Sequence, residues 1–149
     1  MGLSHLEKTL KDSSIFFGHY DHWPDENDRA TLQIFENNTN SKIRVRCFNQ
    51  GPERQHFWSG YSSENDPTIC LWYDKDRLIE ALDERGIQHA SVECLTTDKL
   101  RAEGKKTKLP FYKRTSYGDE NEYRAICVDD KKLKDSSLVI PNTILAKIY

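Results

Sequence analysis

The feature that most constrains the fold is the alternation of short strand-like runs with two stretches of helical spacing. Leu78 and Leu82 lie four residues apart, so they share one face of a helix. Asp74 precedes them as a suitable N-cap, and Gly86 follows at the position where helices commonly end. The spacing therefore predicts a helix over residues 75–85.

A second helix is predicted near the start of the chain. Ser4 and Glu7 form a capping box, in which each side chain bonds to the other's backbone N–H. Leu3, Leu6 and Leu10 follow helical spacing, which predicts a short helix over residues 4–12.

The remaining apolar residues occur in short runs that favour strands. These runs are residues 15–17, 30–35, 42–48, 67–73, 88–95, 110–115, 122–128 and 137–149. The runs 30–35 and 42–48 flank an Asn-rich turn and predict a hairpin, and the run 67–73 is apolar on both faces, as in a central strand. We expect one α+β domain over residues 1–149, with a mixed, mostly antiparallel sheet and two main helices.

Composition narrows the class of protein. The 149 residues carry a net charge of −2, and 36% of them are hydrophobic. The longest apolar runs are far shorter than the roughly 20 residues that a membrane span needs. The first residues do not follow the pattern of a secretory signal. We therefore expect a cytoplasmic protein that contacts no membrane.

The four cysteines each lie inside a strand-like run. None belongs to a C-x-x-C pair, which argues against a structural zinc site. In a cytoplasmic protein we expect reduced thiols that pack as small apolar side chains. The cluster His19-Tyr20-Asp21-His22 has metal-binding side chains but stands in a polar loop. We expect it to be solvated and predict no metal site.

One polar strand carries the strongest chemical signal. Glu120, Glu122 and Arg124 alternate along a predicted strand, so they project to one face. They could line a site where a carboxylate orients a ligand hydroxyl. They could equally form a ladder of ion pairs, in which Arg44 and Arg46 of the neighbouring run are the natural partners.

An aromatic segment precedes the apolar run 67–73. Trp58 and Tyr61 are three residues apart, so one helical turn would set them side by side. Such a pair could stack on a planar ligand, or it could cap the core.

A basic run interleaved with aromatic residues covers residues 105–114. Such runs can follow a phosphate backbone while their rings stack on bases. Acidic residues stand just downstream of this run, at Asp119 and Glu120. We therefore expect a solvated hairpin and no nucleic-acid partner.

Four short blocks resemble an uncharacterised bacterial domain-of-unknown-function family. The blocks are Cys47-Phe48-Asn49, Trp58-Ser59-Gly60-Tyr61, Ile69-Cys70-Leu71-Trp72-Tyr73-Asp74 and Glu120-Asn121-Glu122-Tyr123-Arg124, and the end of the chain, Ile144 to Tyr149, resembles that family's last strand. The family's Asn-Asp-Pro stretch is missing near the first strands. Because the family has no established activity, the resemblance implies a fold more than a function.

Two classes of function remain open. One is binding of a small polar or nucleotide-like ligand by Trp58, Tyr61, Glu122 and Arg124, with Glu120, Arg44 and Arg46 as further contacts. Its enzymatic form is an ADP-ribosyltransferase-like protein, in which NAD is the cofactor and Glu122 is catalytic.

The other class is a protein-interaction module without chemistry, of the kind that mobile elements or phage-related loci encode. Its anchors would be Tyr20, Trp23 and Trp58. A dimer formed through an exposed sheet edge is compatible with either class.

Overall fold

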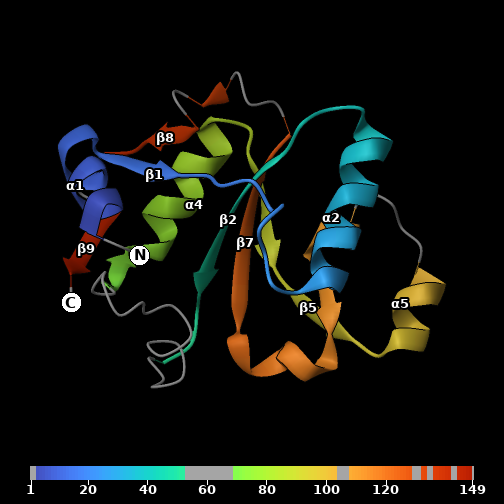
Figure 1. Cartoon of the computed structure of the whole chain (residues 1–149). Helices are drawn as coiled ribbons and strands as arrows, with labels where there is room; N and C mark the ends of the chain where they lie inside the picture. Colours follow the sequence, from blue (N-terminus) through green and yellow to red (C-terminus); the bar gives the residue numbers. More distant parts are fainter. Residues whose placement is uncertain are drawn as a thin grey trace.

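The computed structural model describes residues 3–52, 69–103, 108–128, 132–133, 136–141 and 144–148. Helices and short strands alternate along the chain (Figure 1). The elements are α1 (Leu3–Asp12), β1 (Ser14–Phe16), α2 (Glu26–Thr39), β2 (Arg44–Asn49), β3 (Leu71–Tyr73), α4 (Lys75–Glu84), β4 (Gln88–Ser91), β5 (Glu93–Leu95), α5 (Thr97–Glu103), η1 (Leu109–Phe111), β6 (Tyr112–Arg114), η2 (Thr115–Glu120), β7 (Glu122–Cys127), β8 (Ser137–Val139) and β9 (Leu145–Ile148).

The centre of the molecule is an antiparallel sheet of three strands in the order β2-β7-β4. Three two-stranded sheets surround it: β1 with β8, β3 with β9, and β5 with β6. Only the β5–β6 pair is parallel among these pairs. The α+β class and the mostly antiparallel pairing expected from the sequence are therefore confirmed.

The two faces of the central sheet are covered by different helices, with α4 on one side and α2 on the other (Figure 1). Ala125 and Cys127 of β7 pack in a cluster with Leu78 and Leu82 of α4. Ile126, between them on the strand, packs in a second cluster with residues of α2. Because side chains alternate along a strand, β7 serves both clusters at once.

Both predicted helices are confirmed. The Asp74 carboxylate accepts from the backbone N–H of Arg77 at 3.1 Å and caps α4. Gly86 takes a φ of 59°, a left-handed value that favours glycine just past the end of a helix. The α1 helix covers Leu3–Asp12 and ends at the residue that the sequence predicted, but it begins before Ser4, the predicted N-cap.

The predicted strand at 30–35 is wrong, and so is the hairpin that it would form. Residues Glu26–Thr39 form α2, which Asp25 caps through its side chain. Leu32 and Phe35 lie three residues apart and are both buried, so the helical spacing of these residues decided the structure. The apolar and polar residues of this run alternate only weakly, and a helix buries both Leu32 and Phe35.

The apolar run 67–73 is not a central strand. Of this run, Leu71–Tyr73 forms β3, which pairs only with β9, and Trp72 is 45% exposed. Residues 67 and 68 lie outside the described residues. The central position belongs to β7, whose two neighbours both pair with it along four or more residues.

Two other predicted strands are each divided between different sheets. Residues 88–95 form β4 and β5, and the described part of 137–149 contains β8 and β9. In the part of the chain that the structure describes, no helix is both long enough and apolar enough to cross a membrane.

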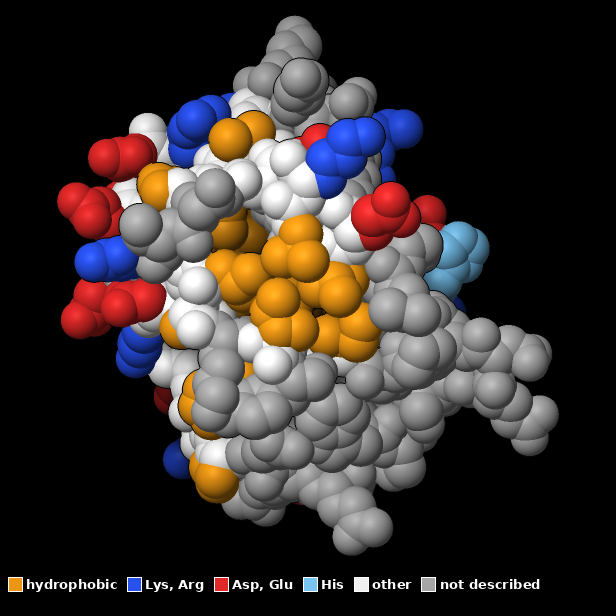
Figure 2. All heavy atoms as spheres, turned by 90° about the vertical axis from the view of Figure 1, so that its left-hand side faces the viewer, with side chains coloured by type: hydrophobic (Ala, Val, Ile, Leu, Met, Phe, Trp, Pro, Cys, Tyr) orange, Lys and Arg blue, Asp and Glu red, His pale blue; other side chains and the backbone are white. Residues whose placement is uncertain are grey.

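The face built from α1, β8 and β9 is rich in apolar side chains (Figure 2). It contains a hollow of about 210 Å³. The described residues that line the hollow are Thr9, Leu10, Ser13, Ile140, Pro141 and Leu145.

Candidate functional site

The polar residues of β7 lie under α2. Glu122 and Arg124 project to the same face of the strand, as their spacing predicted. They are not at a surface, because Glu122 is 7% exposed and Arg124 is fully buried. The sequence left open whether these residues line a ligand pocket or form a ladder of ion pairs on the surface. In the structure they belong to a buried network of ion pairs.

Arg124 is held by protein groups on several sides. Its two terminal nitrogens contact the two carboxylate oxygens of Asp28 at 2.8 Å each, in a bidentate pair. Its Nε donates to Glu122 Oε1 at 2.6 Å, and Nη1 also donates to the carbonyl oxygen of Pro110 at 2.8 Å. The Trp23 ring lies 5.3 Å from the guanidinium carbon. The guanidinium is thus occupied by the protein's own groups.

Lys113 of β6 completes the network. Its Nζ lies 2.7 Å from Glu120 Oε2 and 2.8 Å from Glu122 Oε2, and 3.5 Å from Asp28 Oδ2. Glu120 stands at the end of η2 rather than on the strand, but it still meets its predicted neighbours through this lysine. We call Asp28, Lys113, Glu120, Glu122 and Arg124 the buried network.

The network keeps Glu122 and Lys113 charged. Burial alone would raise the pKa of Glu122, but the adjacent Arg124 charge and hydrogen bond, together with Lys113, lower it to about 2. Burial opposes the charge of Lys113, yet the facing carboxylates raise its pKa above the usual value. Glu122 is therefore ionised and Lys113 is protonated at neutral pH. Neither group is poised for proton transfer.

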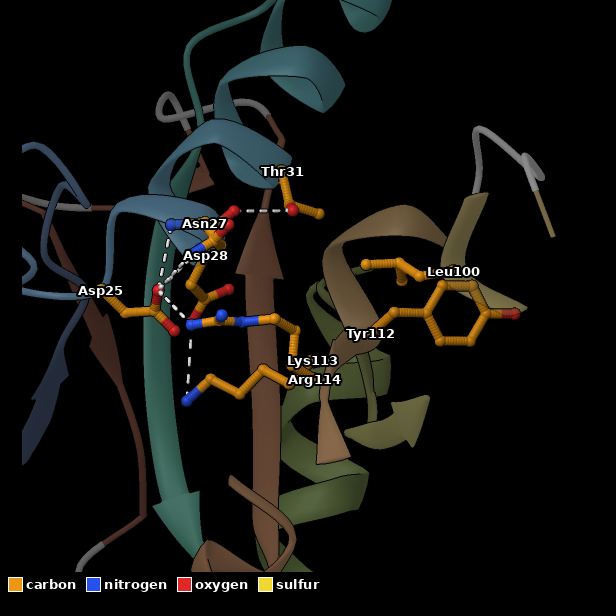
Figure 3. A pocket seen from close by; sticks show the side chains of 8 residues that line it. All are labelled: Asp25, Asn27, Asp28, Thr31, Leu100, Tyr112, Lys113 and Arg114. Carbon is orange, nitrogen blue, oxygen red and sulfur yellow. Dashed lines mark hydrogen bonds and ion pairs between the residues drawn. The ribbon is translucent and has the colours of Figure 1, made fainter. Parts of the chain in front are cut away.

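A shallow depression beside the network is too small for a ligand ring (Figure 3). Its volume is about 10 Å³, close to the space of one water molecule. Asp25 and Arg114 are among the residues that line it, and Arg114 Nη2 lies 3.9 Å from Asp25 Oδ1.

Arg44 and Arg46 lie on the opposite face of the central sheet from the buried network. In the register of β2 and β7, Arg46 pairs with Ala125, whereas Cys47 pairs with Arg124. Since paired residues point to the same side, the two arginines face away from Glu122. They are not the ion-pair partners that we expected. Asp28 and Lys113 have that role.

The two arginines lack acidic partners among the described residues. Both are half-buried, and the Nε atom of each is buried without a hydrogen-bond partner among the described residues. The Arg46 guanidinium lies 5.8 Å from the centre of the Phe48 ring. The Phe48 ring meets the Tyr73 ring edge to face, with 5.8 Å between their centres. Within the described ranges, the buried Tyr73 hydroxyl also has no hydrogen-bond partner.

The same face continues across β7 to the start of α4. Phe48 and Tyr123 are direct neighbours in the register of β2 and β7. Lys75 Nζ lies 6.0 Å from the Tyr123 ring and donates to the amide oxygen of Gln50 at 3.1 Å. We call the set Arg44, Arg46, Phe48, Tyr73, Lys75 and Tyr123 the cation–aromatic face.

His89 of β4 borders this face. Its Nδ1 lies 2.5 Å from the Tyr123 hydroxyl, and its Nε2 lies 2.9 Å from Asp83 Oδ1. The imidazole therefore joins α4 to β7.

Trp58 and Tyr61 lie outside the described residues, so their predicted stacking remains a prediction. In the part of the chain that the structure describes, none of the four cysteines is in a disulfide. Cys127 is buried, and burial raises the pKa of Cys47, whose thiol also bonds to Glu122. Across the described ranges no group of three metal-binding side chains converges.

Sequence reasoning missed Asp28, Lys113, Lys75 and His89. Asp28 was not recognised, because the sequence pattern did not predict the helix that carries it. Lys113 belonged to the basic run that we expected to be solvated. Asp28, Leu32 and Phe35 follow helical spacing and are all buried in α2. This spacing is the sequence signal from which the helix, and with it the position of Asp28, could have been predicted.

Comparisons with known proteins give no relative for this chain. No family model matches it, and neither a curated protein nor a solved structure shows significant similarity.

Proposed function

We propose that this protein binds a small anionic ligand that carries a planar ring, such as a nucleotide, on the cation–aromatic face. One observation carries the proposal: Arg44 and Arg46 stand two residues apart on one face, and no described carboxylate pairs with them. The buried network is a poorer candidate, because its two cations are already paired with its own three carboxylates.

The unpaired arginines favour an anion. Polar groups that are withdrawn from water normally have hydrogen-bond partners, so two partnerless guanidinium nitrogens are costly in the free protein. A phosphate or carboxylate supplies both the charge and the acceptors that these groups lack. Lys75 adds a third cation, and its hydrogen-bond acceptor in the described part of the chain is a neutral amide.

The aromatic side chains favour a ring. Phe48, Tyr73 and Tyr123 are partly buried residues packed against the core beside these cations. An aromatic surface next to positive charge suits a ligand with a planar base and an attached anion. The segment with Trp58 and Tyr61 begins soon after Gln50 in the sequence, and we keep these two residues as further proposed ring contacts.

Ligand binding is tested by thermal unfolding with adenosine, AMP, pyrophosphate and NAD. A ligand at about 100 times its Kd should add about 2.7 kcal/mol to the stability of the folded state, which is a measurable rise in Tm. We expect AMP or NAD to exceed both adenosine and pyrophosphate. A flat response to all four compounds would contradict the proposal.

Arg46→Gln tests the site itself. The loss of one charged hydrogen bond should weaken binding at least about tenfold. The matched control is Arg85→Gln, which removes the same charge from an exposed residue that caps the far end of α4. Equal affinity of the two variants would exclude the arginine pair from the binding site.

We do not extend the proposal to catalysis. An ADP-ribosyltransferase-like reaction would need a carboxylate that reaches NAD, but the two oxygens of Glu122 contact Arg124 and Lys113. We propose instead that Glu122 and Arg124 hold α2 to the sheet that carries the ligand site. A cytoplasmic location is part of the proposal, since four described cysteines without a disulfide suit a reducing compartment.

A further inference from the structure

Tyr123, a member of the cation–aromatic face, is hydrogen-bonded to His89, whose donor and acceptor roles change on protonation. The inference drawn from this bond rests on the proposed function. A neutral imidazole has one donor nitrogen and one acceptor nitrogen. Asp83 can only accept, so the Nε2 of His89 must carry the hydrogen. Nδ1 is then the acceptor, and the Tyr123 hydroxyl must donate to it.

Protonation of His89 reverses this hydrogen bond. Both nitrogens of an imidazolium are donors, so Nδ1 must donate to the Tyr123 oxygen. Burial, followed by the charge of Asp83, raises the pKa of Tyr123, so the phenol keeps its own hydrogen throughout. That hydrogen is then available for another acceptor.

The groups around His89 fit this change. Asp83 of α4 faces its Nε2 and can balance the added positive charge. Tyr123 of β7 faces its Nδ1, and Lys75 of α4 lies above the Tyr123 ring. Glu122 and Arg124 project to the other side of β7. Tyr123, whose hydroxyl hydrogen becomes available when His89 is protonated, is therefore a member of the cation–aromatic face.

We infer that Tyr123 is a hydrogen-bond donor to the ligand only when His89 is protonated, so that the cation–aromatic face binds anionic ligands more tightly at mildly acid pH. The span from β2 to β4 is two strand spacings, about 10 Å, which a nucleotide can bridge.

The hydrogen-bond directions are tested without a ligand. In ¹⁵N-labelled protein, the two ring nitrogens of His89 report which one carries hydrogen. At about pH 8 we expect hydrogen on Nε2 alone, because Asp83 can only accept from it and the Tyr123 hydroxyl donates to Nδ1. Hydrogen on Nδ1 alone would overturn the inference, because Tyr123 could not then donate to it.

The effect on binding is tested with NAD, whose diphosphate linkage keeps its charge over this pH range. We expect the Kd of the full chain for NAD to be on the order of fivefold lower at about pH 5.5 than at about pH 8. His89→Gln and Tyr123→Phe should each abolish the difference. His22→Gln, which changes an exposed histidine, should retain it.

The outcomes separate the two proposals. If NAD binds and depends on Arg46 but shows the same Kd at both pH values, or if His89→Gln keeps the difference, this inference fails and the proposed function stands. If NAD does not bind at either pH, the inference fails. If AMP and pyrophosphate also do not bind, the proposed function fails with it.

Discussion

Glu122 shows how the surroundings of one residue set its chemistry. It contacts Arg124 and Lys113 in a space from which water is almost excluded. A carboxylate between two cations stays ionised and cannot serve as a proton donor near neutral pH. The residue with the strongest sequence signal is thus better suited to holding the fold than to reacting.

The stability of the protein should fall as acid protonates Glu122. Its pKa is lowered from 4.5 to about 2 in the folded protein. The stabilisation is therefore fully present above about pH 4.5 and is lost as the pH falls toward 2. Urea unfolding over this pH range should show the loss.

Glu122→Gln is the variant for this test, because a neutral amide cannot titrate. It should be less stable at neutral pH and lose less stability between pH 4.5 and 2 than the natural protein. An identical acid dependence of the two proteins would show that Glu122 does not titrate with a lowered pKa.

At the scale of elements, a bidentate ion pair fastens α2 to the central sheet. Asp28 is one turn before the buried Leu32, and Arg124 is on the middle strand. The pair also links α2 to η1 through the Pro110 carbonyl. Breaking a buried pair leaves an uncompensated charge, and this costs more than the intact pair contributes.

Asp28→Asn should therefore lower the free energy of unfolding by about 3–5 kcal/mol. Denaturant unfolding measures this change. The matched control is Glu26→Gln in the same helix, which removes only an exposed 3.8 Å contact with Arg29 and should cost less than about 1 kcal/mol. Similar losses for the two variants would contradict the role of the buried pair.

Some helices and strands could be predicted from the sequence pattern, and others could not. The α4 helix was predicted because its cap, apolar face and terminal glycine agree, and β2 because its alternation is strict. The α2 helix was missed because its apolar residues are few and its N-terminal half is polar. Its buried acid looks like a loop residue until its partner Arg124, 96 residues away in the sequence, is known.

At the scale of the whole molecule, the central sheet joins two apolar clusters. Leu82 belongs to the cluster under α4, and Leu32 to the cluster under α2. Neighbouring residues of β7 enter each cluster, so the loss of one should loosen the other. We expect the chain to unfold as one cooperative unit.

Leu82→Ala and Leu32→Ala test this expectation. Each should lower the free energy of unfolding by about 2–5 kcal/mol, because each removes a fully buried side chain. Circular dichroism and tryptophan fluorescence should give coincident transitions in both variants. Two separate transitions in either variant would indicate that the clusters unfold independently.

The sequence by itself determined the features that depend on neighbours along the chain. These include both predicted helices, the strand positions of β2 and β7, and the shared face of Glu122 and Arg124. Capping, apolar spacing and strand alternation are local, so they can be read without the fold.

Only the tertiary structure decided which charges meet. It paired Arg124 with Asp28, and it turned Arg44 and Arg46 to the other face, away from Glu122. The reason is that an ion pair depends on strand register and helix placement, which bring together residues far apart in the sequence. Register also left two arginines without a described carboxylate, and this makes their face the proposed site.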